Sequence, residues 1–340
     1  MTYQIAINGM GRIGRCVFRA FYESTDYPAL RIAAINDVAD INTLAHLLRY
    51  DSTHGRFLGD IAVEGDYLNI NGDRIRVFRE PLLPRLDWSD LEIDLVMECS
   101  GSFGDRDTAM QHVRAGAKRV LFSQPGASDV DATVVYGINH EALTGNETII
   151  SNASCTTNAI IPVIQCLDNN FGISHGVITT IHSAMNDQPV IDAYHPSDLR
   201  KTRSAMQSII PVETEIARGI GRILPHLSHS FAAQAIRVPT VNVSAIDLTI
   251  TTTTGVNREQ VNAAIVCASD ELATNILGIT EEPLASCDFN HDPRSAIVDL
   301  NFTCVSGSSL VKVLTWFDNE WAYANRMLDL AQYLHGLDTG

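Results

Sequence analysis

The spacing of hydrophobic and polar positions changes several times near the start of the chain, and each change marks an element. Residues 3–8 are a short apolar run, glycines follow it, and residues 12–23 carry apolar side chains at helical spacing. A second apolar run at 30–35 leads into a helix-like stretch at 40–50. Strand, turn, helix and strand in this order predict a βαβ unit and therefore a parallel sheet.

The same alternation continues to Cys155 with one interruption. Residues 57–79 alternate around the turn signals EGD and NGD, which predicts a small antiparallel insertion. A helix is predicted over 105–116. Further strands are predicted at 91–100, 117–123, 131–139 and 148–154.

The chain changes character after Cys155. Long β-branched runs at 176–182 and 241–254 predict a mostly antiparallel sheet with a few helices. Between them, residues 183–215 contain three prolines and little periodicity; a stretch of this length is too long for an ordinary connection and typical of a functional loop. The amphipathic stretch 319–336 predicts a helix that returns to cover the first domain.

Composition narrows the class of protein. The chain has 340 residues, which suggests about two domains at the usual ~100–200 residues each. No apolar run approaches the ~18 residues of a membrane-spanning helix, and the N-terminus has no basic segment ahead of an apolar one, so we expect a cytoplasmic chain. A net charge of −16 disfavours nucleic acid as a partner. Seven cysteines without a CxxC pair argue against disulfides and structural zinc.

Three glycines form a recognisable loop between the first strand and the first helix. Gly9, Gly11 and Gly14 fit G-x-G-x-x-G, in which the first permits the turn, the second lets a pyrophosphate approach, and the third allows close packing. Asp37 lies 23 residues beyond Gly14, where a carboxylate can bind both ribose hydroxyls and repel a 2′-phosphate. The pattern predicts NAD rather than NADP; a plain glycine turn between packed elements is the alternative.

These patterns together predict an α/β fold with a Rossmann dinucleotide-binding domain and an α+β catalytic domain that has a mostly antiparallel sheet. The NAD-binding domain is expected over 1–154, completed by a C-terminal helix at 319–340. The catalytic domain is expected over 155–318.

Cys155 and His182 are the candidate reactive pair. Cys155 opens a helix-like run, and the first turn of a helix lowers the pKa of a thiol; a buried small side chain is an equally weighted alternative. His182 ends a predicted strand where the long loop begins, which suits either a general base or a structural histidine.

A dinucleotide site in the same chain as this pair suggests aldehyde oxidation. The thiolate of Cys155 would add to the aldehyde and give a thiohemiacetal, whose hydride passes to nicotinamide and leaves a thioester. His182 would take the hydroxyl proton, and a backbone N–H at Cys155 would stabilise the oxyanion. The stretch DFNHDPRS at 288–295 holds a histidine and acids, but its Asn and Pro indicate a turn, and we expect no metal site.

Several motifs give the chain a close resemblance to the glyceraldehyde-3-phosphate dehydrogenase family along nearly its whole length. They are INGMGRIGR, SNASCTTN, TTIHS, NDQ, RVPTVNVS and WFDNEWAYANRM. The resemblance implies an NAD-dependent homotetramer with Cys155 and His182 as catalytic pair. It implies that Arg12 and Ile13 line the pyrophosphate, Asp37 the ribose, Ser100 and Ser123 the cofactor cleft, and Asn319 and Tyr323 the nicotinamide. Substrate contacts are implied for Ser154, Thr156, Asp187, Arg200, Thr214 and Arg237.

Two departures from that family bear on the acyl acceptor. A hydroxylated pair usually precedes NDQ and a Thr-Gly pair follows IIPTT, whereas this chain has Ala184-Met185 and Thr214-Glu215. Met185 removes a hydroxyl from the expected substrate-phosphate site. Glu215 places a negative charge where inorganic phosphate would be held, which would leave the thioester to water; a Glu215 side chain that simply faces solvent is an equally weighted alternative.

These substitutions most resemble the erythrose-4-phosphate dehydrogenase branch, together with VIDAYHPSDLR, QSIIPVET, DFNHDPRSAIVD and YDSTHGRF. That resemblance implies oxidation of D-erythrose 4-phosphate to 4-phospho-D-erythronate in pyridoxal 5′-phosphate biosynthesis. A phosphorylating glyceraldehyde-3-phosphate dehydrogenase is the alternative enzyme, and a cofactor-binding regulator with remnant catalytic residues is a further class.

Overall fold

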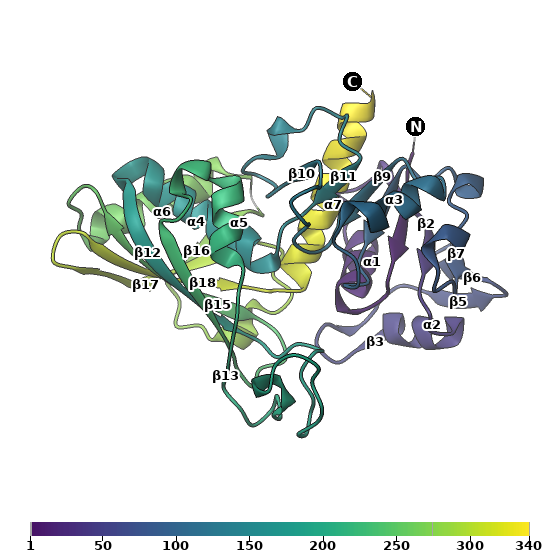
Figure 1. Cartoon of the computed structure of the whole chain (residues 1–340), viewed down its shortest axis with the longest axis horizontal. Helices are drawn as coiled ribbons and strands as arrows, with labels where there is room; N and C mark the ends of the chain where they lie inside the picture. The colour runs from purple at the N-terminus through teal and green to yellow at the C-terminus, as the bar shows by residue number, and fades with distance from the viewer. Residues whose placement is uncertain (1, 274, 340) are drawn as a thin grey trace. The chain divides into compact units, whose positions relative to one another are not determined.

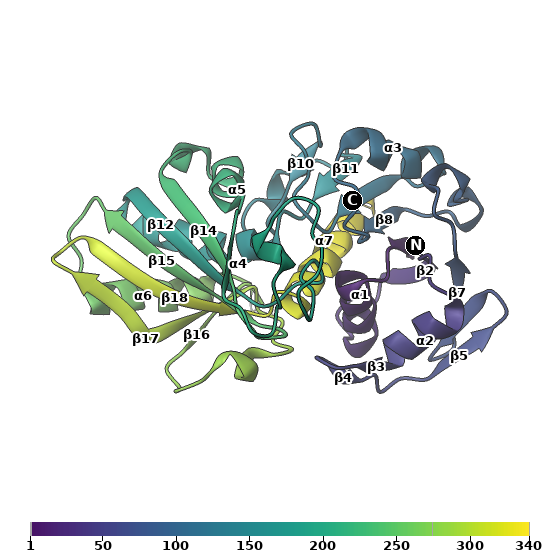
Figure 2. The same ribbon diagram turned by 60° about the horizontal axis from the view of Figure 1, so that its bottom comes forward.

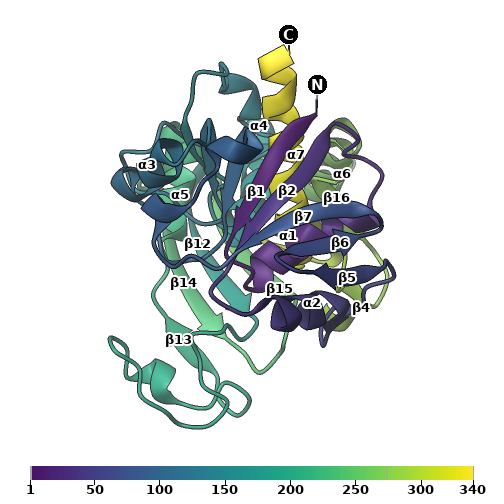
Figure 3. The same cartoon turned by 90° about the vertical axis from the view of Figure 1, so that its right-hand side faces the viewer.

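The strands predicted before Cys155 form one sheet in the computed structural model of the chain, which describes residues 2–273 and 275–339. In sheet order they are β10 (Ala132–Thr133), β11 (Ile149–Ser151), β9 (Arg119–Phe122), β8 (Leu95–Glu98), β1 (Tyr3–Asn8), β2 (Leu30–Asn36), β7 (Asp73–Phe78), β6 (Tyr67–Ile70) and β5 (Ile61–Glu64). Figure 3 shows β1, β2, β7, β6 and β5 side by side.

The order of these strands creates a switch point at β1. All neighbours from β10 to β7 pair parallel, whereas β7 with β6 and β6 with β5 pair antiparallel, as expected for the insertion. The chain builds outward from β1 through β2 on one side and through β8 on the other. Open parallel sheets bind ligands at such a point, outside the carboxyl ends of the strands.

The chain divides into two units, and the helices of the first unit flank this sheet. The first unit comprises Met1–Ser154 and Tyr323–Gly340, and the second comprises Cys155–Ala322. The helices of the first unit are α1 (Arg12–Glu23), α2 (Ile41–Arg49), α3 (Arg106–Arg114) and, from Tyr323 onward, α7 (Trp321–Thr339) (Figure 1). The short strands β3 (Tyr50–Asp51) and β4 (Gly55–Arg56) form a hairpin after α2. No helix in the described residues has both the length and the apolar content needed to cross a bilayer.

The second unit contains a mostly antiparallel sheet, as predicted. Its strands, in sheet order, are β13 (Ile210–Val212), β14 (Phe231–Arg237), β12 (Ile173–His182), β15 (Ser244–Thr252), β18 (Leu310–Phe317), β17 (Ala296–Ser306) and β16 (Leu277–Thr280) (Figure 2). β12 and β14 run parallel in a register that pairs His182 with Arg237 at their carboxyl ends. Helices α4 (Cys155–Phe171) and α6 (Arg258–Glu271) pack on the sheet, and α5 (Ile216–Ile223) packs on α4 and β14.

Several predicted strands are shorter in the structure than the sequence indicated, and two of them have a clear local cause. Within 131–139 only β10 forms, because the Asn139 side chain accepts a hydrogen bond from the Val135 N–H and donates one to the Thr133 carbonyl, which turns the chain. Within 91–100 the strand starts only at Leu95, because a 3-10 turn at Ser89–Leu91 ends at Glu92 with φ of 50°.

Candidate active site

The glycine loop between β1 and α1 has the geometry that a dinucleotide requires. Gly9 has φ of +93°, and a Cβ there would lie 2.5 Å from the Ser100 backbone, while a Cβ at Gly14 would lie 2.0 Å from the Gly9 carbonyl oxygen. A Cβ at Gly11 would meet nothing within 4 Å in the described residues. Gly11 is the N-cap of α1, and no described side chain caps that helix. The loop thus presents open space and a helix N-terminus, which together attract phosphate.

A cavity of about 320 Å³ opens at the carboxyl ends of β1, β2 and β8. Of the predicted cofactor residues, Gly9, Gly11, Asp37 and Ser100 line it. The Asp37 carboxylate accepts hydrogen bonds from the backbone N–H groups of Met10 at 2.7 Å and Ala39 at 2.9 Å. Each of its oxygens keeps a lone pair for a ligand hydroxyl, so the cavity fits the adenosine half of NAD.

A buried polar network supports the floor of this cavity. The Glu98 carboxylate accepts hydrogen bonds from the Asn8 side chain at 2.6 Å, the Ser100 backbone N–H at 2.8 Å and His112 Nε2 at 2.9 Å. The Trp88 indole N–H donates to His112 Nδ1 at 3.1 Å. Because Nδ1 is an acceptor, Nε2 carries the proton that His112 donates to Glu98. The network continues from Asn8 to the Asn36 side chain at 2.7 Å.

Sequence reasoning missed Asn8, Asn36 and Glu98. Each is the last residue of an apolar strand in the parallel sheet, namely β1, β2 and β8. A polar residue at that point of a buried strand lies where ligands of such sheets bind, and this was the available signal.

The other expected cofactor residues take varied positions. Arg12 and Ile13 open α1, and the Arg12 guanidinium forms an ion pair with Asp51. Ser123 follows β9, and its backbone N–H donates to the Glu98 carbonyl at 3.0 Å. The buried Tyr323 hydroxyl donates to the Ala153 carbonyl at 2.8 Å, so it braces the backbone two residues before Cys155.

Cys155 and His182 come together in the second unit. Cys155 is the first residue of α4 and His182 the last residue of β12, and Cys155 Sγ lies 3.9 Å from His182 Nε2. His182 Nδ1 lies 2.9 Å from the Ser183 carbonyl oxygen, which can only accept a hydrogen bond. Nδ1 also lies 3.3 Å from Arg237 NH1, which can only donate, but the contact with the carbonyl is the shorter one; Nδ1 therefore carries the proton, and the lone pair of Nε2 points to the thiol. This is the tautomer that a general base for Cys155 needs.

The charge state of the pair differs from the sequence expectation for Cys155. Burial raises the pKa of the Cys155 thiol, although the Thr156 hydroxyl and the Arg237 charge offset part of that rise. Burial and the nearby Arg237 lower the pKa of His182 to about 4. Both side chains are therefore neutral at pH 7, because desolvation of the thiolate outweighs the helix terminus in the ligand-free chain. The thiol must lose its proton to His182 as it attacks.

Of the residues expected to bind substrate, Ser154, Thr156 and Arg237 lie close to this pair. The Thr156 hydroxyl lies 3.9 Å from Cys155 Sγ, beside the half-buried Ser154. Arg237 NH1 lies 3.3 Å from His182 Nδ1 and 3.4 Å from the Ser183 carbonyl, and in the described residues it has no carboxylate partner. A half-buried cation of this kind is a good site for an anionic substrate group.

The remaining substrate candidates lie on the long loop and at the start of α5. The Asp187 carboxylate accepts from Lys201 Nζ at 2.7 Å; burial raises the pKa of Asp187, but Lys201, Arg237 and a backbone hydrogen bond together lower it below its usual range. Arg200 is exposed in a 3-10 turn and makes no contact with Cys155 or His182 in the described residues. The Thr214 hydroxyl accepts from the Ile216 N–H at 3.4 Å, so it faces the N-terminus of α5.

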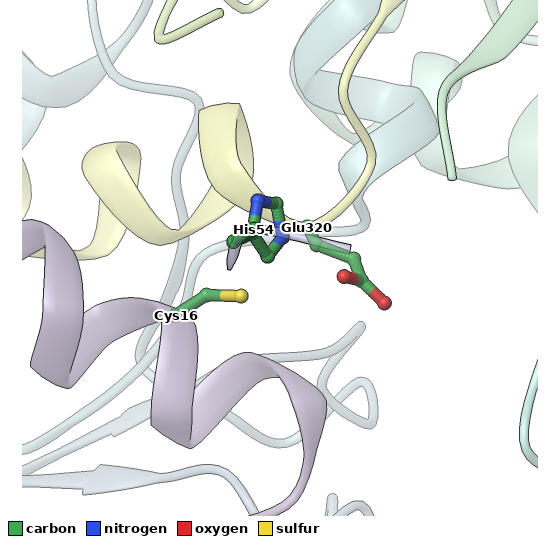
Figure 4. Close-up of side chains that lie close together, drawn as sticks. All are labelled: Cys16, His54 and Glu320. Atoms are coloured by element: carbon green, nitrogen blue, oxygen red, sulfur yellow. The ribbon is translucent and has the colours of Figure 1, made fainter. Parts of the chain in front are cut away.

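Side chains that could bind a metal also lie elsewhere in the described residues. In the first unit, ligand atoms of Cys16 on α1 and His54 after β3 lie within 4.8 Å of each other; Glu320, drawn with them, belongs to the second unit (Figure 4). In 288–295, Asp292 forms a 2.6 Å ion pair with Arg294, and the His291 ring stacks on Trp321.

We expect Gly14 to be required for the fold and Gly11 to be required for binding of the dinucleotide. Gly14→Ala is expected to destabilise the chain by about 1–3 kcal/mol, because the new methyl group would meet backbone. Gly11→Ala should cost at most about 1 kcal/mol through the weaker N-cap yet lower dinucleotide affinity at least tenfold. Thermal denaturation and calorimetric titration with NAD measure the two effects. Equal loss of stability in both variants, or unchanged affinity in Gly11→Ala, would contradict this assignment.

The raised pKa of Cys155 predicts how its alkylation depends on pH. His182 stays neutral above pH 5, so the rate of reaction with iodoacetamide should climb from pH 7 to pH 9 without a plateau, since the thiol ionises above its ordinary pKa of 9.0. Cys155→Ser supplies the background from the exposed Cys267, Cys287 and Cys304. A plateau near pH 6 would instead show a preformed thiolate and imidazolium pair.

Comparison with known protein families agrees with this geometry in both units. Residues 3–106 match the family model described as glyceraldehyde 3-phosphate dehydrogenase, NAD binding domain. Residues 154–319 match the model described as glyceraldehyde 3-phosphate dehydrogenase, C-terminal domain. The first match covers the glycine loop, Asp37 and Ser100, and the second covers Cys155, His182 and Arg237. The chain therefore belongs to the glyceraldehyde 3-phosphate dehydrogenase family and is an NAD-dependent oxidoreductase.

Proposed function

We propose that the chain oxidises D-erythrose 4-phosphate to 4-phospho-D-erythronate, with water as the acyl acceptor, as a step of pyridoxal 5′-phosphate biosynthesis. One observation carries the proposal. At the two positions where relatives are expected to hold anions with a hydroxyl and with a glycine, this chain has Met185 and Glu215. The catalytic pair is complete, so chemistry is retained while the sites for phosphate are altered.

The pair Cys155 and His182 accounts for both halves of the reaction. His182 Nε2 takes the thiol proton as Sγ adds to the aldehyde carbon, and the same nitrogen gives that proton to the new hydroxyl and takes it back later. NAD, when bound, supplies the two-electron acceptor that turns this thiohemiacetal into a thioester. His182 releases that proton to solvent and then removes a proton from water, whose oxygen attacks the thioester carbon. The carbon–sulfur bond breaks, Cys155 regains a proton, and the product is a free acid.

Arg237 is the proposed anchor for the negative charge of the substrate. Its guanidinium contacts His182 and Ser183 but pairs with no carboxylate in the described residues, while Asp187 is already engaged by Lys201. Met185 is 45% exposed and offers no hydroxyl, so an anion near it relies more on the guanidinium.

Glu215 disfavours inorganic phosphate and so supports water as the acyl acceptor. Its surroundings weaken this effect. Glu215 is the N-cap residue of α5, but its side chain makes no capping hydrogen bond; its carboxylate forms a 2.7 Å ion pair with Arg218, so that guanidinium is already engaged by an anion. A carboxylate about 5 Å from a phosphate costs about 3 kcal/mol per charge at an effective dielectric near 20. Because the Glu215 side chain is 66% exposed and paired, solvent reduces the net effect to about 1 kcal/mol. Glu215 therefore weakens phosphate binding by a modest factor.

We also propose that the chain works as a homotetramer, with the loop 183–215 at subunit contacts. That loop exposes large apolar side chains: Val190, Ile191, Tyr194, Leu199 and Ile209 are each more than 70% exposed. A loop with this many exposed apolar side chains is expected to be covered by a partner.

The alternative enzyme, a phosphorylating glyceraldehyde-3-phosphate dehydrogenase, predicts a different substrate profile. The proposed function requires that erythrose 4-phosphate is oxidised faster than glyceraldehyde 3-phosphate at equal concentration, and that omission of inorganic phosphate leaves the rate within about twofold. NADH formation at 340 nm in matched buffers with and without phosphate measures both. Phosphate-dependent turnover that is faster on glyceraldehyde 3-phosphate would establish the alternative.

A glycine at position 215 is expected to restore part of the phosphate response. Glu215→Gly should raise the stimulation of turnover by inorganic phosphate by about fivefold, which corresponds to about 1 kcal/mol. Glu213→Gly is the matched control, because it removes an exposed carboxylate two residues away that has no ion pair in the described residues. Equal stimulation in both variants would mean that Glu215 acts only through the net charge of the chain.

A further inference from the structure

A second cavity lies in the first unit, at the other end of the parallel strands from the dinucleotide cavity. It has a volume of about 520 Å³. Its lining includes Gln4, Arg31 and Arg74, which are the second residues of β1, β2 and β7 (Figure 3). These strands end at the dinucleotide cavity, and the two cavities have no lining residue in common. A ligand in the second cavity therefore leaves room for NAD in the first.

One wall of this cavity is a face of the sheet that carries three arginines. Gln4 pairs with Arg31, and Tyr67 pairs with Arg76, on neighbouring strands. Residues paired in this way point to the same face of a sheet. Arg74 is two residues before Arg76 on β7, so it shares the face of Arg76. Three guanidinium groups thus line one cavity in a chain whose net charge is −16.

The ring of Tyr67 holds two of these guanidinium groups. Arg74 Cζ lies 3.7 Å and Arg76 Cζ lies 5.1 Å from the centroid of that ring. Stacking on a ring leaves the N–H groups at the edge of a guanidinium free to donate. Arg76 forms a 3.1 Å ion pair with Asp66, whereas Arg31 and Arg74 form no ion pair in the described residues. Two cations in the cavity are therefore available to an anion.

A different part of the lining carries two carboxylates. Asp90 lies in the 3-10 turn Ser89–Leu91, and Glu92 follows that turn; both residues are exposed and line the cavity. Neither forms an ion pair within the described part of the chain, so the cavity keeps these carboxylates apart from the arginines. Separate exposed charges are ordinarily solvated, but here they line a single cavity, and its volume lies within the range of roughly 300–1,000 Å³ that is typical of small-molecule sites.

We infer that this cavity binds a small water-soluble zwitterion, with a phosphate or carboxylate group at Arg31 and Arg74 and an ammonium group at Asp90 and Glu92. The edge of a guanidinium matches two oxygens of such an anion, and an ammonium group offers three donors to carboxylates. An anion without an amine would be repelled by the two acids, and an amine without an anion would be repelled by the arginines. Phosphorylated amines and amino acids are the class of ligand that meets both demands.

Two probes that differ in one group test this assignment. O-phosphoserine and 3-phosphoglycerate both carry a phosphate and a carboxylate, but the first has an ammonium group where the second has a hydroxyl. Calorimetric titration of the chain saturated with NAD, which fills the dinucleotide cavity, should show that phosphoserine binds about fivefold more tightly. Arg237 can hold either probe by its anionic groups, so the difference between the probes reports on the second cavity.

The acidic part of the lining is tested by the double variant Asp90→Asn, Glu92→Gln. It should bind the two probes with about equal affinity, because neither new side chain carries a charge for the ammonium group. Asp87→Asn is the matched control, since Asp87 is an exposed carboxylate on the same segment that does not line the cavity. The control should keep the natural preference for phosphoserine.

The basic wall is tested by the double variant Arg31→Gln, Arg74→Gln, which should weaken the binding of phosphoserine about tenfold through the loss of two charged donors. Arg56→Gln is its control, because the exposed Arg56 also lies near a ring, with Cζ 5.8 Å from the centroid of Tyr50, but does not line the cavity. All four variants should form NADH at the natural rate with the aldehyde that the natural chain oxidises, which shows that they are folded.

The inference is overturned if the natural chain binds both probes equally, or if the double variant of the acids keeps the preference for phosphoserine. It is also overturned if the double variant of the arginines binds phosphoserine as tightly as Arg56→Gln does. Sedimentation with phosphatidylserine vesicles separates a free ligand from a lipid headgroup. The chain should stay in the supernatant; sedimentation that the double variant of the acids abolishes would assign the cavity to a lipid and overturn the inference of a soluble ligand.

Discussion

A hydrogen bond to one backbone carbonyl decides what the second unit can do chemically. The Ser183 carbonyl accepts from His182 Nδ1, and this leaves Nε2 as the only basic nitrogen that faces Cys155. The carbonyl belongs to the residue after the end of β12, so the sheet itself sets the tautomer and no carboxylate is needed for it. The ring is neutral because burial, together with the charge of the half-buried Arg237, lowers the pKa of His182 to about 4, although the hydrogen bond to Ser183 opposes this fall. The consequence is a weaker base.

In the first unit a buried side chain, Glu98, is likewise held by hydrogen bonds at the ends of strands. The sheet delivers Asn8, Asn36 and Glu98 to one edge because they end neighbouring strands. Three donors satisfy the oxygens of the Glu98 carboxyl group, so it is buried without an unpaired polar atom. In both units the polar groups of the site lie at the carboxyl ends of strands or directly after them.

Patterns local in sequence were enough to predict much of this molecule. The glycine loop, Asp37, Cys155 and His182 all lie at the ends of elements, and the alternation of strands and helices gave the two sheets. The roles of Ser183 and Glu98 could not be predicted in this way, because each depends on the placement of segments far apart in the chain. The pKa of Cys155 was predicted in the wrong direction, since helix position can be read from sequence but burial at that site cannot. Glu215 was expected to repel phosphate by its charge, and only the structure shows the ion pair with Arg218 that moderates it.

The two backbone hydrogen bonds of Asp37 have a consequence for the evolution and redesign of cofactor choice. Its oxygens accept from Met10 in the glycine loop and from Ala39 ahead of α2, so the carboxylate joins the two loops that shape the adenosine cavity. A change to a small neutral residue that admits a 2′-phosphate would also leave both N–H groups without an acceptor. A substitution of Asp37 therefore changes the dinucleotide preference and the hydrogen bonding of both loops at once. A switch to NADP requires a residue that still accepts both N–H groups, which narrows the accessible substitutions to short polar side chains.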